Sequence, residues 1–435
     1  MSPQITLHTP LQLPPAEIPN YLNQLWSNDE SGNKGANTFC LLVWQPAWME
    51  QKLVKSKKVD GPILGNHRLD LVDAARKIVL EEDLPHSTPP LDKSVHASVP
   101  LSNSPENIKD LRGQHIDSAI SDLKPRRLIT LAPTIDNGDE LEALVAAYCP
   151  LLEEGGGNNA CGDVVVFRGG MATINEGLGI IEDLMPKDLP SWLWWNGSID
   201  EAKELLSQLS TPNRRIIIDT ALGDPCLCLQ LLNEKIQTGQ AVNDLNWLRL
   251  RSWRETLAMV FDPIQRRNEL NNVVKLDIDV EGNNPVQGLL LTGWIASRLN
   301  WKLQKCESKD EGIMEAIFTR ADEKIVKFRL TALPIGNPSI HPGALVGLRL
   351  ISEPESSDKK AICVILASES GECMRLEAGG MASMDLIEEV VPIQNSSVEE
   401  DVARLLASSR GSTSPLLEAT TPIATELLRL SNWIE

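Results

Sequence analysis

The residues with the clearest capacity for chemistry are tryptophans and arginines gathered in one short stretch. Residues 243–263 read NDLNWLRLRSWRETLAMVFDP, and this stretch holds Trp247, Arg249, Arg251, Trp253 and Arg254. An indole or a guanidinium removes a large area from water and still forms hydrogen bonds, so both are enriched where proteins bind one another. The cluster therefore predicts recognition of a partner.

The same stretch also carries the pattern of a core helix. Leu250, Leu257 and Phe261 follow helical spacing, with Trp253 beside them, so one face is expected to enter a core. On this interpretation Trp253 fills the core and the arginines pair with surplus acidic residues. The alternative keeps the three arginines on a partner-facing surface. Charge reversal at Arg249 and Arg251 is then expected to weaken partner binding without unfolding the chain.

Motifs for catalysis are absent from the sequence. The glycines of FRGGMATINEGLG (167–179) lack the G-x-G-x-x-G spacing of a dinucleotide site, and no P-loop is present. Five of the six histidines lie at or before position 115, and His341 stands in a Pro-flanked turn without triad partners. Asp219 follows a predicted strand, as catalytic carboxylates do, but no second group converges on it. We therefore predict no catalytic residue, no cofactor and no enzymatic activity.

Composition narrows the choice of partners. The chain has 435 residues, a formal charge of −19 and 42% apolar residues, which favours two or three globular domains. The negative charge disfavours nucleic acid and anionic membranes as partners. No apolar run approaches the ~20 residues of a membrane span, and no secretory signal is visible, so we expect a cytoplasmic protein. The eight cysteines form no C-x-x-C pair, so we expect no metal site.

The N-terminal part predicts small elements and a linker. Residues 1–57 hold an expected helix (15–26) and a strand (38–46). Residues 58–92 resemble, in degenerate form, the small helical peptidoglycan-binding-like module, and 93–124 have the composition of a linker.

The rest of the chain predicts an α/β domain over 125–270 and an α+β domain over 271–435. Apolar strands and helices alternate in the first domain, which indicates a largely parallel sheet. The expected strands are 126–133, 163–170, 191–197 and 214–220, and the expected helices are 139–148, 177–185, 199–209 and 224–237. In the second domain a strand at 273–282, a helix at 286–301 and five further strands predict an antiparallel sheet, closed by helices at 398–409 and 416–430.

The order of several motifs identifies a family. RRLITLAP, CGDVVVFRGG, DLPSWLWWNG, RRIIIDT, DLNWLRLRSWRETLAMVFD and GLLLTGWIASRLNW follow one another in the chain. This series resembles the OpcA family, the glucose-6-phosphate dehydrogenase assembly proteins, in its cyanobacterial branch. The resemblance implies a non-enzymatic allosteric activator that binds the dehydrogenase oligomer at the entry to the oxidative pentose phosphate pathway. The chain is not the dehydrogenase, because its two tyrosines, Tyr21 and Tyr148, lack the Asp-His-Tyr-x-Gly-Lys context.

The family resemblance also implies redox control through thioredoxin. Cys363 and Cys373 flank the turn ASESGE and are the redox candidates. A turn at Glu369-Ser370 would place Cys373 opposite Leu366, which separates the two Cα atoms by more than the ~7 Å that a disulfide allows. Cys226 and Cys228 would point to different sides of a helix, so we nominate no disulfide pair.

Two other functions remain open from the residues alone. The α/β domain could bind or process a sugar phosphate, with Arg168, Arg214 or Arg215 receiving the phosphate. Residues 58–92 could bind a glycan, although the missing secretory signal conflicts with that role.

Overall fold

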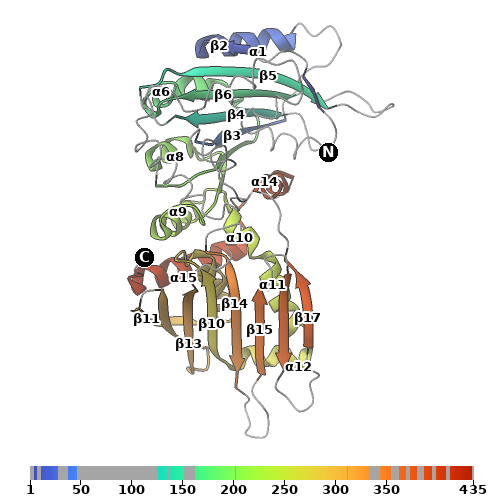
Figure 1. Cartoon of the computed structure of the whole chain (residues 1–435), viewed down its shortest axis with the longest axis vertical. Coiled ribbons are helices and arrows are strands. Elements are labelled where there is room, and N and C mark those ends of the chain that lie inside the picture. Colours follow the sequence, from blue (N-terminus) through green and yellow to red (C-terminus); the bar gives the residue numbers. More distant parts are fainter. Residues whose placement is uncertain are drawn as a thin grey trace, which may run out of the picture.

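The computed structural model stacks two β-sheets along its long axis (Figure 1). The structure describes residues 4–6, 11–27, 38–46, 126–134, 138–150, 162–200, 202–310, 312–333, 343–353, 362–368, 373–379, 387–393, 398–407 and 412–433. The predicted module at 58–92 and the linker at 93–124 lie outside these residues.

The first sheet has nine strands and is largely parallel, as predicted. Its order is β1-β5-β6-β4-β3-β7-β8-β9, with β2 also pairing with β5. The strands are β1 (Gln4–Thr6), β2 (Leu11–Leu13), β3 (Phe39–Trp44), β4 (Arg126–Pro133), β5 (Glu142–Pro150), β6 (Gly162–Gly169), β7 (Ser191–Trp195), β8 (Arg214–Ile218) and β9 (Val242–Asp244). All pairs from β6 to β9 are parallel, and β5 runs antiparallel to β6.

The N-terminal segment belongs to this sheet. Strand β3 pairs with both β4 and β7, so residues predicted as a separate segment form a central strand. Its run FCLLVW is apolar throughout because both faces of the sheet are covered. Numbered along the chain, the six parallel strands have the order 3-2-1-4-5-6, which is the doubly wound order with a switch point between β3 and β7.

Helices from the first part of the chain cover one face of the first sheet, and a C-terminal helix covers part of the other. The helices on the first face are η1 (Pro15–Glu17), α1 (Ile18–Ser27), α6 (Met171–Glu176), α7 (Leu178–Asp183), α8 (Lys203–Leu209) and α9 (Pro225–Gln237). The predicted helix at 139–148 is wrong, because this segment forms β5. Its apolar residues satisfy a strand as well as a helix, and pairing with β6 decides between them. The helix predicted at 199–209 is present but begins later, since α8 starts at Lys203, without a side-chain cap.

The second sheet has eight strands in the order β11-β12-β13-β10-β14-β15-β16-β17. They are β10 (Val273–Glu281), β11 (Lys302–Asp310), β12 (Ile313–Thr319), β13 (Ile325–Leu333), β14 (Leu345–Ser352), β15 (Ile362–Ser368), β16 (Cys373–Gly379) and β17 (Ile387–Pro392). The sheet is mixed, because β10 and β13 are parallel while the other pairs are antiparallel. Strand β10 confirms the strand predicted at 273–282, and its buried and partly exposed residues alternate from Leu276 onward. A register shift between Val273 and Lys275 buries Val273 in place of Val274.

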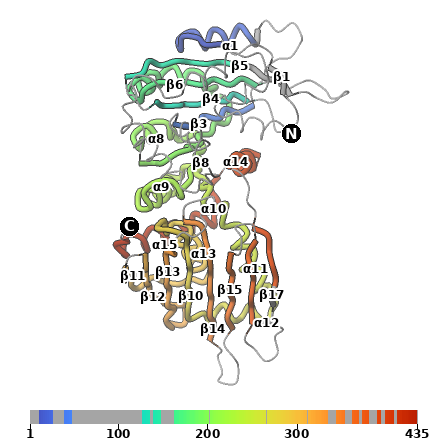
Figure 2. Tube along the Cα trace, viewed as in Figure 1, coloured from blue at the N-terminus to red at the C-terminus, as the bar shows by residue number. Residues whose placement is uncertain are grey.

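The remaining helices join the two sheets. They are α10 (Leu245–Arg249), α11 (Arg251–Phe261), α12 (Ile264–Arg267), η3 (Asn268–Asn272), α13 (Val286–Arg298), α14 (Val398–Ala407) and α15 (Pro415–Ser431). Helix α15 packs against both α13 and α9, so one hydrophobic core runs through both sheets. Helix α14 returns to the side of the first sheet (Figure 2). There Val398 and Val402 join a cluster with Trp192 and Trp194. The second predicted domain therefore contributes a helix to the first.

Candidate functional site

The Trp/Arg stretch forms two short helices, where the sequence predicted one. Helix α10 starts directly after β9, and the Asp244 side chain accepts a hydrogen bond from Asn246 N (3.1 Å) as its N-cap. Helix α11 follows after Leu250. Its apolar face is buried as predicted, and Trp253 lies on that face with 3% of its surface exposed. The core interpretation is thus confirmed for Trp253.

Arg249 is an internal residue of the junction. Its two terminal nitrogens donate to Asp219 Oδ1 and Oδ2 at 2.8 and 2.6 Å, and both side chains are largely buried. Burial alone would lower the pKa of Arg249, but the charge and hydrogen bonds of Asp219 raise it. The expectation that Arg249 faces a partner does not fit this placement. Asp219 likewise serves the structure as the counter-ion of Arg249.

Asp244 anchors a hydrogen-bond chain between the two sheets. Its carboxylate accepts from Thr220 N (3.0 Å) and Thr220 Oγ1 (2.8 Å). Asn246 accepts from Gln287 Nε2 of α13 (3.0 Å), and Gln287 Oε1 accepts from Leu345 N of β14 (2.7 Å). Burial, reinforced by the charge of Asp219, raises the pKa of Asp244 to about 6. This series of hydrogen bonds fixes α10 relative to the second sheet.

Arg251 begins an exposed stripe on α11. Its guanidinium pairs with Glu255 (2.8 Å), and both side chains are more than half exposed. Met259 follows at the same helical spacing with 46% of its surface exposed, and in the next helix Ile264 and Arg267 are exposed as well, Ile264 at 72%. Apolar side chains beside arginines are typical of a protein-binding surface. We call Arg251, Glu255, Met259 and Ile264 the α11 stripe.

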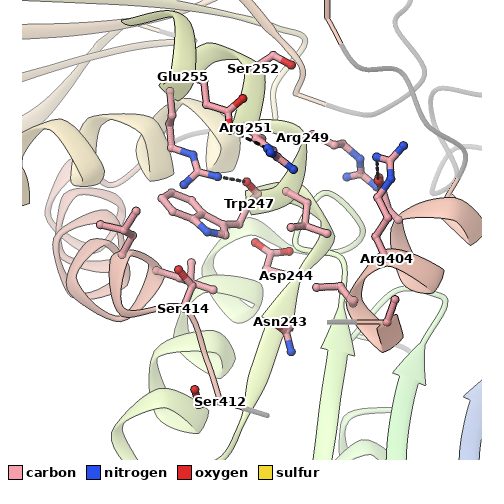
Figure 3. A pocket seen from close by; sticks show the side chains of 17 residues that line it. Asn243, Asp244, Trp247, Arg249, Arg251, Ser252, Glu255, Arg404, Ser412 and Ser414 are labelled. Carbon is pink, nitrogen blue, oxygen red and sulfur yellow. Dashed lines mark hydrogen bonds and ion pairs between the residues drawn. The ribbon is translucent and has the colours of Figure 1, made fainter. Parts of the chain in front are cut away.

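A pocket opens next to the α11 stripe. It has a volume of about 680 Å³ and lies between α10, α11, α14 and the start of α15 (Figure 3). Its chemically distinctive lining residues are Asp244, Trp247, Arg249, Arg251, Arg254, Glu255, Asp401, Arg404, Ser412 and Ser414. Four of the five residues singled out in the sequence thus meet in one pocket. Its residues from α14 and α15 were missed because only tertiary packing brings them here.

Arg254 is the unusual cation of this pocket. Its guanidinium carbon lies 3.7 Å from the centroid of the Trp247 ring, within cation–π distance. Its nitrogens donate to Leu250 O (3.4 Å) and Trp247 O (3.3 Å). Burial lowers the pKa of Arg254 to about 10, although Glu255 opposes the shift.

The switch point of the first sheet does not fit a dinucleotide. Trp44 and Trp195 end the neighbouring strands β3 and β7, are fully buried, and stack with ring centroids 4.6 Å apart. The turn after β3 reads Gln45-Pro46, without the glycines that let a pyrophosphate approach backbone N–H groups. Pro46 moreover has no N–H. The residues present therefore do not form the phosphate-binding turn that this strand order carries in dinucleotide enzymes.

The arginines expected to receive a sugar phosphate are held apart. Arg214 pairs with Glu182 (2.8 Å) and is buried, and Arg215 lies over the Trp192 ring at 5.0 Å. Arg168 faces Glu142 across β5 and β6 at 3.8 Å. The pocket between α10, α11, α14 and α15 contains none of these three arginines.

The redox candidates lie at opposite ends of one hairpin. Cys363 pairs in register with Gly379, six residues beyond Cys373, so about 20 Å separates the two cysteines along the strands. The prediction that Cys373 lies opposite Leu366 was wrong, because Leu366 pairs with Leu376. The two cysteines do not oppose each other, as expected. Burial raises the pKa of the Cys363 thiol, which disfavours the reactive thiolate.

Three further features bear on function. All six histidines lie outside the described residues. Within the described ranges no cluster of three His, Cys, Asp or Glu residues could hold a metal ion. No helix in the same part of the chain is long and apolar enough to cross a membrane.

Solved structures share only a distant likeness with the chain. One is a 3-ketoreductase mutant from Actinomadura kijaniata in complex with NADP and TDP-benzene, at 8% identity and a TM-score of 0.39 over 58% of this chain and 79% of that one. Another is a dehydrogenase from Chromobacterium violaceum, at 11% identity and a TM-score of 0.39 over 58% and 78%. Likeness at this level carries no inference about cofactor or activity.

Sequence relatives give a much stronger match. Residues 117–234 and 240–420 match the models of the N-terminal and C-terminal domains of the glucose-6-phosphate dehydrogenase subunit. A Synechococcus elongatus protein named OxPP cycle protein OpcA is 32% identical, covering 92% of this chain and 93% of its own length. A Nostoc punctiforme protein of the same name is 28% identical over 98% and 96%. The chain therefore belongs to the OpcA family.

Proposed function

We propose that this protein binds the glucose-6-phosphate dehydrogenase oligomer and raises its activity without catalysing a reaction itself. The observation that carries the proposal is the match of both subunit-domain models, in order, along one chain. The filled switch point supports the non-catalytic part, because the Trp44–Trp195 stack and Pro46 stand where this strand order would bind a cofactor.

Activation without chemistry requires only a difference in affinity. A partner that binds the active state of the dehydrogenase more tightly shifts the population toward that state. A coupling free energy of about 1–3 kcal/mol changes an apparent affinity roughly 5- to 150-fold. We place the contact on the α11 stripe, which presents Met259 and Ile264 as exposed apolar side chains in addition to the exposed Arg251. Arg249 and Trp253 would support this surface from inside.

Matched substitutions test the placement of the contact. Arg251 and Arg429 both have 59% exposed side chains and both pair with a glutamate on their own helix. We expect Arg251→Glu to weaken binding of the same organism's dehydrogenase at least about tenfold, measured by biolayer interferometry. Arg429→Glu should bind like the wild type.

A second pair of substitutions tests the apolar residues of the α11 stripe. Met259→Glu should also weaken binding, whereas Ile325→Glu places the same charge on a comparably exposed apolar residue of β13 and should not. Equal binding by all four variants would remove the α11 stripe from the contact. No binding by the wild type would overturn the proposed function itself.

A further inference from the structure

The pocket beside the α11 stripe contains one guanidinium without a counter-ion. Arg249 pairs with Asp219, Arg251 with Glu255 and Arg404 with Asp401. Within the part of the chain that the structure describes, no carboxylate lies within 4 Å of Arg254. A guanidinium has five N–H donors, and the two carbonyl contacts leave three of those of Arg254 for another acceptor.

Keeping this cation partly buried costs free energy. A charge removed from water is normally compensated by an opposite charge. The face of Trp247 and two carbonyl oxygens compensate Arg254 only in part, and its lowered pKa has this physical cause. The position of Arg254 therefore favours binding of an anion from solution.

The start of α15 adds a second attraction for an anion. Ser414 is the N-cap of this 17-residue helix, and it makes no side-chain capping bond. Leu416 and Leu417 lie in the first turn of the helix, and backbone N–H groups of the first turn have no hydrogen-bond partner within the helix. Both residues also line the pocket. The N-terminal end of a helix carries a partial positive charge that stabilises phosphate and carboxylate groups.

We propose that this pocket binds a small phosphorylated anion, with Arg254 and the N-terminus of α15 as its main contacts. Arg404 and Arg251 stand at the pocket wall and can add charge when the ligand draws them from their carboxylates. The volume of about 680 Å³ suits a metabolite-sized ligand. The pocket shares Arg251 and Glu255 with the α11 stripe, but binding of the ligand to this chain alone does not depend on the proposed function.

Isothermal titration calorimetry of the purified full chain tests the proposal without a partner protein. The probes are inorganic phosphate and glucose 6-phosphate, with glucose and sodium chloride at matched ionic strength as controls. We expect saturable binding of at least one phosphorylated probe and none of glucose. Arg254→Met keeps the stem on the Trp247 ring and should weaken this binding at least about tenfold.

Two further variants separate the site from general charge effects. Arg404→Met removes a half-exposed wall residue and should weaken binding severalfold. Arg429→Met removes a similarly exposed arginine from the other end of α15 and should leave binding unchanged. Lack of saturable binding by both probes would overturn the proposal, and so would unchanged binding by Arg254→Met. Loss of dehydrogenase binding in that variant, without any probe binding to the wild type, would instead assign Arg254 to the protein contact.

Discussion

Arg249 and Asp219 hold each other inside the junction between the two sheets, through two hydrogen bonds of 2.8 and 2.6 Å. The pair joins the carboxyl end of β8 to α10, so it positions the Trp/Arg stretch. Removing one partner of a buried pair leaves the other charge uncompensated, which is more costly than losing an exposed pair. Charge reversal at Arg249, expected from the sequence to be tolerated, would place two carboxylates together.

Substitution at Arg249 should therefore reduce stability. We expect Arg249→Met to lower the free energy of unfolding by about 3–5 kcal/mol, because Asp219 stays buried without its counter-ion. Arg251→Met, which breaks only an exposed pair, should have little effect. Urea unfolding followed by circular dichroism measures both. Equal stability of the two variants would show that the pair does not hold the junction.

Asp244 gives the junction a dependence on pH. Its folded pKa of about 6 exceeds the usual value of 3.8, so the folded protein binds this proton more tightly than the unfolded chain. The contribution of Asp244 to the free energy of unfolding is complete below the pKa that this residue has in the unfolded chain, and it is lost as pH rises through about 6. The charged groups that interact with Asp244 are Asp219 and Arg249, which pair with each other.

The Asn variant isolates this contribution. Between about pH 5.5 and about pH 7.5, wild-type stability should fall by about 1 kcal/mol relative to Asp244→Asn, since the amide does not titrate. Denaturant midpoints at several pH values provide the measurement. Parallel pH curves for the two proteins would contradict the raised pKa.

At the level of elements, the sequence predicts where helices and strands lie along the chain better than it predicts which elements pair or pack with one another. The parallel strands and the helices α9 and α13 follow their apolar patterns closely. Strand β5 was assigned as a helix, because its apolar spacing fits both periods and only pairing with β6 distinguishes them. Strand β11 was missed because KLQKCESKD is mostly polar, as an edge strand tolerates. The pocket depends on α14 and α15, whose distant placement no local pattern encodes.

The contact between α13 and α15 offers a direct test of that packing. A Cβ added to Gly293 would lie 2.7 Å from Thr420 O, whereas one added to Gly179 of α7 meets nothing within 4 Å. Gly293→Ala should therefore lower the melting temperature by several degrees. Gly179→Ala should raise it slightly, because alanine favours a helix by about 1 kcal/mol over glycine. A neutral Gly293→Ala would mean that the two helices separate easily.

For the whole molecule, the strand order and the filled switch point describe a doubly wound scaffold without a fitting cofactor turn. The sequence alone could predict that the glycine motif of a dinucleotide site is absent. It could not predict that Trp44 and Trp195 meet, because β3 and β7 are separated by about a third of the chain and become neighbours only in the sheet. What the molecule offers instead is the α11 stripe and the pocket at the junction of its two sheets.

Titration of glucose-6-phosphate dehydrogenase activity with this protein tests the proposed activation directly. The dehydrogenase comes from the same organism, and the assay varies glucose 6-phosphate under reducing and oxidising conditions. We expect a saturable fall in apparent KM or rise in kcat, no turnover by this protein alone, and a weaker response to Arg251→Glu than to Arg429→Glu. A flat response under both conditions would show that this protein does not activate the dehydrogenase.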